Sequence, residues 1–281
     1  MKTKLQEYKN HPFSMLMFIL IILSAVIMIG AMIFIIGYIL VRGIPNMKPE
    51  LFEWQFTSEN QSMMPAIINT VLMTLCTLVM AVPVGVFSAI YLAEYSKKGS
   101  KIVKIIRMTV ETLSGIPSIV YGLFGFLAFV IALHWQYSFI SGAITLAIMV
   151  LPLIMRTTEE ALLAVSDSYR EASFGVGAGK LRTVFKIVLP AAMPGILSGV
   201  ILAIGRIVGE TAALIYTAGT VAEVSKGLLS SGRTLAIHMY VLSSEGLYTN
   251  QAYATAVVLL IFVLIINFMS SLVAKKFAAK D

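Results

Sequence analysis

The sequence predicts an all-α integral membrane protein with six transmembrane helices. Hydrophobic residues make up 58% of the 281 residues and charged residues only 12%, which is about half the charged share of a soluble domain. Several apolar stretches reach or approach the roughly 20 residues that a helix needs to cross the hydrocarbon core. Helices are expected because lipid offers no hydrogen-bond partner to an open backbone.

The elements follow in order along the chain. The predicted spans cover residues 14–41, 65–92, 113–133, 138–155, 188–217 and 253–274. The first apolar run is about twice as long as the core of a signal peptide and has no small-residue cleavage site, so we expect a retained helix. Prolines occur in or at the ends of the later spans, at positions 83, 117, 152, 190 and 194, and predict bends there.

Positive charge predicts the orientation of these spans. The two chain ends, residues 93–112 and residues 156–187 together hold sixteen Lys and Arg residues, whereas residues 42–64 and 218–252 hold four. Since Lys and Arg accumulate in cytoplasmic loops, both termini are predicted to be cytoplasmic, in the inner membrane. Orientation and anionic lipid therefore explain the net charge of +7, and no nucleic-acid partner is predicted.

Two simple site classes are not supported. Cys76 is the single cysteine and lies in an apolar run, so neither a disulfide nor a metal cluster is predicted. The segment GVGAGK, residues 175–180, looks at first like a phosphate-binding loop. That motif would require glycine where Phe174 stands and Ser or Thr where Leu181 stands. No cofactor is therefore predicted in this chain.

The polar segment 170–190 fits another pattern. It reads E-A-S, three residues, G, nine residues, I-x-L-P, and the matching residues are Glu171, Ala172, Ser173, Gly177, Ile187, Leu189 and Pro190. Small Ala172 and Ser173 would let a short helix approach a partner closely, Gly177 would allow a sharp turn, and Pro190 suits the first turn of the next helix. The alternative is an ordinary amphipathic cytoplasmic loop.

This pattern resembles the EAA loop of the membrane subunits of bacterial ABC importers, with Ser173 in place of the second alanine. The resemblance implies the type I importer permease fold. It also implies that the loop, at about residues 157–187, docks in a groove of a cytoplasmic ATPase dimer. That separate partner would bind ATP and Mg.

Charges also fall near or within the predicted spans. Arg206 and Glu210 are expected in the middle of the 188–217 span, where a charge costs about 2.5–3.5 kcal/mol on insertion scales. At a spacing of four residues they would share a helix face and could pair. They would line a wet path or form a structural ion pair. Arg156, at the end of the 138–155 span, is either an interfacial anchor or a contact for an anion leaving the path.

The segments 114–125, 151–162 and 205–219, together with the EAA loop, resemble the PstA-type permease subunit of phosphate-specific ABC importers. The resemblance covers about residues 60–275. It implies that Arg156, Arg206 and Glu210 lie on a phosphate pathway. It also implies three partners: a homologous second permease, the ATPase dimer and an extracytoplasmic phosphate-binding protein. The implied role is transport, not catalysis.

The expected organisation has three parts. Residues 1–63 hold the N-terminal tail, the first span and an outer loop, residues 64–275 form the permease core, and residues 276–281 form a cytoplasmic tail. Other functions stay open at this point. They are an ABC importer of another cargo (molybdate, sulfate or an amino acid), a secondary transporter that uses Arg206 and Glu210 for proton coupling, and a membrane enzyme.

Overall fold

The computed structural model describes residues 12–97 and 99–278. The expected N-terminal tail and the last three residues of the expected C-terminal tail lie outside this described part. Within it, helices and turns account for the whole architecture, and no strand is formed. The all-α prediction is therefore confirmed.

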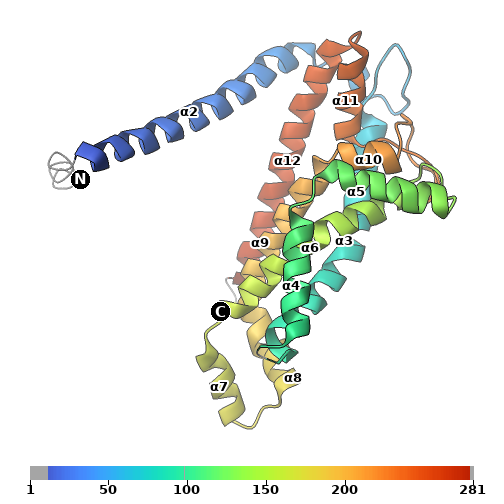
Figure 1. Cartoon of the computed structure of the whole chain (residues 1–281). Helices are drawn as coiled ribbons and strands as arrows, with labels where there is room; N and C mark the ends of the chain where they lie inside the picture. The colour runs from blue at the N-terminus through green and yellow to red at the C-terminus, as the bar shows by residue number, and fades with distance from the viewer. Residues whose placement is uncertain (1–11, 98, 279–281) are drawn as a thin grey trace.

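Three long helices form the centre of the bundle. They are α3 (Met64–Ile90), α6 (Phe139–Leu163) and α9 (Leu189–Val208), and α6 packs against both of the others (Figure 1). The side chains of Leu146, Val150 and Ile154 on α6 are fully buried. α12 (Thr249–Ala278) packs along α9, and α11 (Leu235–Glu245) packs beside α12. The apolar core thus lies around α6.

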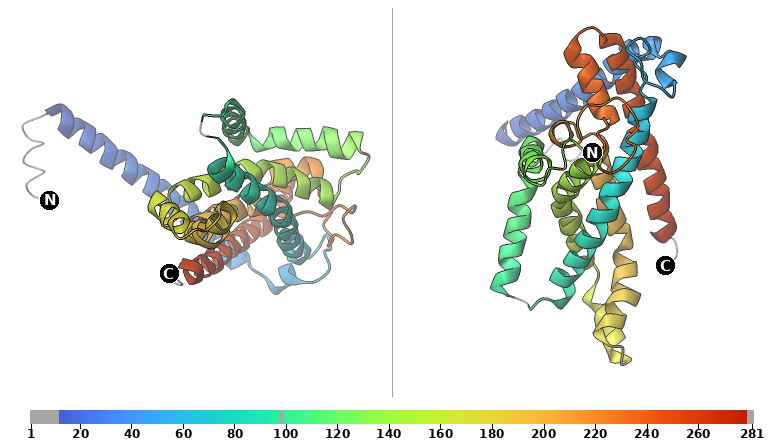
Figure 2. Two further views of the ribbon diagram at one scale, coloured as in Figure 1. Left: turned by 90° about the horizontal axis from the view of Figure 1, so that it is seen from below. Right: turned by 90° about the vertical axis from the view of Figure 1, so that its right-hand side faces the viewer.

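The first helix, α2 (Pro12–Gly43), leaves the bundle at an angle (Figures 1 and 2). Near its C-terminal end, the Tyr38 ring contacts the Tyr253 ring of α12 edge to face, with ring centroids 5.8 Å apart. Two short turns follow, η1 (Ile44–Asn46) and η2 (Pro49–Phe52). Most side chains along α2 are exposed, so its apolar surface is free to face lipid or another chain.

The predicted span 113–133 is not one straight helix. α4 (Lys101–Ser114) runs beside α6. A bend of 101° separates it from α5 (Ser118–Gly125), which continues into the π-helical turn η4 (Phe126–Ala132). Pro117 causes the break because it lacks an N–H group and disfavours helix at the preceding residue. Five helices are long and apolar enough to cross a membrane, or six if this bent pair counts as one span, within the described residues.

Two other boundaries differ from the prediction. α6 continues to Leu163, and within this extension Arg156 forms an ion pair with Glu160 one turn later, which stabilises the helix modestly. The predicted span 188–217 is divided into α9 and a separate short helix, α10 (Ala212–Thr217). Gly209 ends α9 between them.

Close packing of α5 on α10 depends on Gly122. A Cβ atom at this position would lie 2.7 Å from the Cα of Ala213, which belongs to the backbone of α10. We expect Gly122→Ala to lower the free energy of unfolding by about 1–3 kcal/mol, because one backbone must move. Thermal unfolding in detergent measures this loss. Gly30→Ala on α2 is the control, since nothing lies within 4 Å of its Cβ position; equal unfolding midpoints for the two variants would contradict the prediction.

Candidate functional site

Residues 164–188 form a loop that projects beyond one end of the bundle (Figure 1). It contains α7 (Asp167–Gly175), α8 (Lys180–Thr183) and the π-helical turn η5 (Val184–Val188). α7 starts where the Ser166 side chain accepts a hydrogen bond from the N–H of Ser168, at 3.4 Å, and Asp167 adds a negative charge to the positive end of the helix dipole. The sequence pattern of residues 171–190 therefore falls on two short helices and the start of α9.

Gly177 makes the turn between α7 and α8, as predicted from the sequence. Its φ angle is +83°. The N–H of Gly177 donates to the carbonyl of Phe174, and the N–H of Ala178 donates to that of Ser173. These two bonds form the Schellman motif, which ends a helix with a left-handed residue.

Replacing Gly177 by alanine is expected to strain this turn. A left-handed conformation costs an L-residue about 1–2 kcal/mol, so we expect the amides at the end of α7 to exchange hydrogen about five- to thirtyfold faster. Hydrogen exchange with mass spectrometry measures this. Gly179→Ala is the matched control because Gly179 has a φ of −75° and open space at its Cβ position. Similar exchange in both variants would disprove the role of the φ angle.

Ser173 has a different position from the one expected. Its side chain is only 4% exposed, and its hydroxyl lies 2.8 Å from the hydroxyl of Thr183 on α8. Ser173 therefore joins the two helices of the loop and does not face a partner. Glu171 and Ala172 are exposed, so they remain available for contact with another chain.

The end of the pattern anchors the loop to the bundle. Val188 is fully buried in an apolar cluster with Leu162 and Ile90, and Leu189 packs against that cluster. Ile187 is half-buried. Pro190 occupies the first turn of α9, which continues directly from η5. The prediction for Pro190 is confirmed.

Large apolar side chains are exposed at the far end of this loop. We call this surface the apolar tip; its members are Phe174, Val176 and Leu181, which lie at or near the turn between α7 and α8. Val176 is 86% exposed. Exposed apolar side chains that gather on a projecting loop are typical of a protein contact surface.

The structure separates Arg206 and Glu210. Arg206 lies in the last turn of α9, but Glu210 follows the end of that helix. The Glu210 carboxylate accepts a hydrogen bond from the N–H of Ala213 at 3.0 Å and so caps α10. Within the described residues, none of the ion pairs includes Arg206. The expectation that both charges share a helix face in mid-span is therefore wrong, because the helix ends at Val208.

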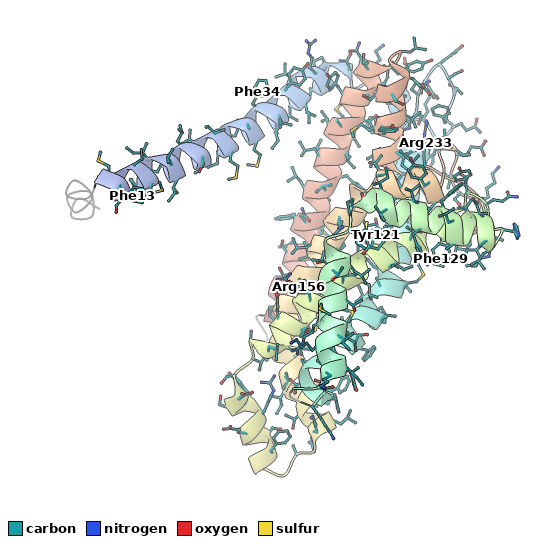
Figure 3. All side chains as sticks on the ribbon, in the orientation of Figure 1. Phe13, Phe34, Tyr121, Phe129, Arg156 and Arg233 are labelled. Carbon is teal, nitrogen blue, oxygen red and sulfur yellow. The ribbon has the colours of Figure 1, made fainter. Side chains whose placement is uncertain are left out.

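Arg206 is half-buried, and its charge is close enough to act on the hydroxyl of Tyr121. Tyr121 stands near the bend between α4 and α5 (Figure 3), and its hydroxyl donates to the carbonyl of Leu113 at 2.8 Å. The guanidinium therefore lies near the point where the bent pair meets the bundle. It has donor groups free to meet an anion.

Arg156 lies in a charged groove of about 330 Å³ between α4 and α6. We define the charged groove by its five ionisable residues, Arg107, Glu111, Arg156, Glu159 and Glu160. Arg156 pairs with Glu160 at 2.8 Å, with both side chains about 60% exposed. The Arg107 Nε donates to Glu159 at 2.8 Å and joins α4 to α6. Sequence reasoning missed this second pair, because Arg107 and Glu159 are 52 residues apart in the chain.

A second polar cluster, also missed, lies at the opposite end of the bundle (Figure 3). Arg233 is 4% exposed and its guanidinium lies 4.7 Å from the ring centroid of Phe56. Burial lowers the pKa of Arg233 to about 10. Burial, together with the charge of Arg233, lowers the pKa of the fully buried His238 to about 3, so this imidazole is neutral at pH 7. The cluster secures the segment around Phe56 against the start of α11.

Metal chemistry has no support in the described part of the chain, where no three His, Cys, Asp or Glu residues gather. The projecting loop, the half-buried Arg206 and the charged groove are thus the candidate functional features. They suit contact with a partner chain and passage of an anion.

Comparison with known proteins gives consistent matches. The family described as "Binding-protein-dependent transport system inner membrane component" matches residues 81–280. A probable ABC transporter permease protein, YqgI, of Bacillus subtilis is 31% identical and covers 92% of this chain and 95% of its own. The phosphate transport system permease protein PstA of Yersinia pestis is 33% identical over 87% of this chain and 84% of its own.

A solved structure supports the fold. The crystal structure of a bacterial ABC transporter involved in the import of the acidic polysaccharide alginate aligns with a TM-score of 0.67 at 16% identity. The alignment covers 98% of this chain and 99% of the other. At this level of identity the likeness concerns the arrangement of helices alone, and that arrangement is the one seen in ABC importer permeases.

Proposed function

Because the chain belongs to the family of binding-protein-dependent transport system inner membrane components, we propose that it is a permease subunit that moves inorganic phosphate in an ATP-driven importer. The proposal that phosphate is the cargo rests on the similarity of this chain to PstA permeases. These relatives include the Yersinia pestis protein and a PstA 2 of Mycobacterium bovis that is 33% identical over 82% of this chain. The chain is thus a transport subunit, not an enzyme.

The chain is a multi-pass protein of the inner membrane. Its orientation follows from the projecting loop and the basic residues. If the loop faces the ATPase, the end of the bundle with α7 and α8 is cytoplasmic, and nine Lys and Arg residues in the described parts of segments 93–112 and 156–187 fall on or near that side. α12 runs from the opposite end back toward this side (Figure 1), which supports the proposal of a cytoplasmic C-terminus. The N-terminus is assigned to the same side by the lysines of its tail.

The apolar tip is the proposed contact with a cytoplasmic ATPase dimer, which would bind ATP and Mg. The tip is exposed and adjoins the hydrogen-bonded turn at Gly177, so it suits insertion into a groove. A ligand shifts a conformational equilibrium only by its different affinities for the two states. ATP would therefore act through a movement of its own subunit, which changes the position of the loop.

Two further partners complete the proposed importer. A homologous second permease would supply the other half of the pore. An extracytoplasmic phosphate-binding protein would deliver the cargo at the end of the bundle opposite the loop. Membrane lipid would cover the outward apolar faces, including part of α2.

Arg206 is the proposed main contact for phosphate in this chain. An isolated anion in an apolar medium is very costly, and a guanidinium presents a fixed fork of donors that matches phosphate oxygens. Its lack of a carboxylate partner among the described residues leaves those donors available. Arg156, with its exposed ion pair, would act nearer the cytoplasmic exit, where loose binding favours release. Glu210 would act indirectly, by capping α10.

Reconstitution tests this function. The complete complex in liposomes, with the binding protein and ATP, should accumulate labelled phosphate, and excess unlabelled phosphate should compete while molybdate, sulfate and amino acids should not. Competition by one of those compounds at equal concentration would instead assign another cargo. Uptake that persists after ATP is removed while an ion gradient is kept would identify a secondary transporter and disprove the proposal.

A further inference from the structure

The C-terminal end of α3 is held by the projecting loop at two points. The last turn of this segment is the π-helical turn η3 (Tyr91–Tyr95). From α7, Arg170 donates to Glu94 through Nη2 at 2.6 Å and through Nε at 3.1 Å. From α8, the ammonium group of Lys180 lies 5.1 Å from the ring centroid of Tyr95. Both helices of the loop therefore contact one turn of the bundle.

Arg170 also contacts the end of α6. Its Nη1 donates to the carbonyl of Val165 at 2.7 Å, and its Nη2 donates to that of Leu162 at 2.9 Å. These carbonyls belong to the end of α6 and the residues after it, where helical partners are missing. One side chain thus connects α6, α7 and η3.

The ion pair is well shielded from water. The Arg170 and Glu94 side chains are 15% and 8% exposed, whereas the pair between Arg156 and Glu160 is mostly exposed. Removal of one partner from a buried pair leaves an uncompensated charge. Separation of Arg170 from Glu94 is therefore costly, and η3 should follow the loop when the loop moves.

On its other side, η3 reaches the charged groove. Leu92, 4% exposed, forms an apolar cluster with Val103 of α4 and Met155 of α6. Leu92 and Met155 also line the charged groove, and Met155 is the neighbour of Arg156. An unbroken series of contacts thus runs from α7 through Arg170, Glu94 and Leu92 to the groove.

We infer that Arg170 and Glu94 are positioning residues that transmit movement of the loop through η3 to the charged groove. This inference rests on the proposed function, because the movement would begin with the ATPase. A π-helical turn is a rare irregularity that is frequent at functional sites, and here it lies where the loop meets a spanning helix. Neither residue needs to touch the cargo.

The test measures how accessible the charged groove is to a labelling reagent in the assembled complex. Val110 lines the groove, so Val110→Cys in a Cys76→Ser background reports its accessibility to a water-soluble maleimide. In the otherwise unchanged chain, labelling should differ at least about threefold between the nucleotide-free and the ATP-trapped complex. Glu94→Gln should abolish most of this difference while the ATPase remains bound.

Asp167→Asn is the matched control. Asp167 pairs with the same guanidinium at 3.2 Å, but its side chain is 82% exposed. This variant should keep the nucleotide-dependent labelling.

If Glu94→Gln hinders assembly, Lys180→Met tests the second contact. This variant should assemble, since Lys180 is exposed, and it should reduce the labelling difference about twofold.

Several outcomes would overturn the inference. The first is no nucleotide-dependent labelling difference in the unchanged chain, and the second is a full difference in Glu94→Gln. The third is a loss of the labelling difference in Asp167→Asn that equals the loss in Glu94→Gln. The fourth applies where Glu94→Gln does not assemble, and it is an unchanged labelling difference in Lys180→Met. Failure of the proposed function has a separate signature. A complex that shows the nucleotide-dependent change at position 110 but takes up no phosphate would disprove the cargo and leave this link in place.

Discussion

Replacing Arg206 by glutamine is expected to lower phosphate uptake about tenfold or more at equal abundance in the membrane. The physical reason is the loss of a permanent charge and its forked donors, since a hydrogen bond to a charged group contributes about 1.5–3 kcal/mol. Arg206 is half-buried at the end of α9, so bulk water replaces it poorly. Initial uptake of labelled phosphate by the reconstituted complex measures the effect.

Two variants sharpen this result. Arg206→Lys keeps the charge but loses the fork, so its uptake should fall between those of the unchanged chain and the glutamine variant. Arg42→Gln is the control, because Arg42 also lies in the last turn of an apolar helix but far from α9 in the chain and on the diverging α2 (Figure 1). It should leave uptake nearly unchanged. Full uptake by Arg206→Gln would remove Arg206 from the pathway.

The projecting loop could be predicted from the sequence in unusual detail. Its pattern consists of residues whose backbone needs are local: Gly177 takes a left-handed turn, and Pro190 begins a helix. Such needs are visible in a single sequence. The role of Ser173 was missed because its partner, Thr183, is chosen by the way in which two helices fold onto each other.

The break between α9 and α10 was missed for a different reason. The residues before Arg206 and after Thr211 are mostly apolar, so hydropathy predicts one continuous span across the polar residues between them, and a glycine inside a helix is tolerated at a modest cost. α9 ends at Gly209, and Glu210 accepts a hydrogen bond from the N–H of Ala213 at the start of α10. Hydropathy does not distinguish this role of Glu210 from pairing with Arg206. The spacing of four residues was informative only if the helix continued.

Ion pairs between distant segments were beyond the reach of the sequence. Arg107 and Glu159 are 52 residues apart, and Arg170 and Glu94 are 76 apart. Nothing local selects these partners among the other charges. They form because α4, α6 and η3 come together around Leu92, Val103 and Met155, and that packing is a property of the folded chain.

Replacing Val176 by aspartate is expected to release most of the ATPase from the complex. Val176 is 86% exposed at the apolar tip and follows directly after α7, so in a docked complex its side chain would be buried against the partner. The variant loses the burial of a valine, about 1.5–3 kcal/mol, and adds the cost of removing a carboxylate from water. Together these terms predict a loss of affinity of about a hundredfold or more.

Co-purification of the ATPase with a tagged complex in detergent measures this release, and ATP hydrolysis stimulated by the binding protein measures its consequence. Val221→Asp is the control for an exposed valine, 48% exposed, at the opposite end of the bundle; it should retain the ATPase. Val176→Thr keeps the size of the side chain and adds one hydroxyl, so it should weaken retention only slightly. If Val176→Asp retained both the ATPase and stimulated hydrolysis, the apolar tip would not be the docking surface, and the exposed Glu171 and Ala172 face of α7 would have to take that role.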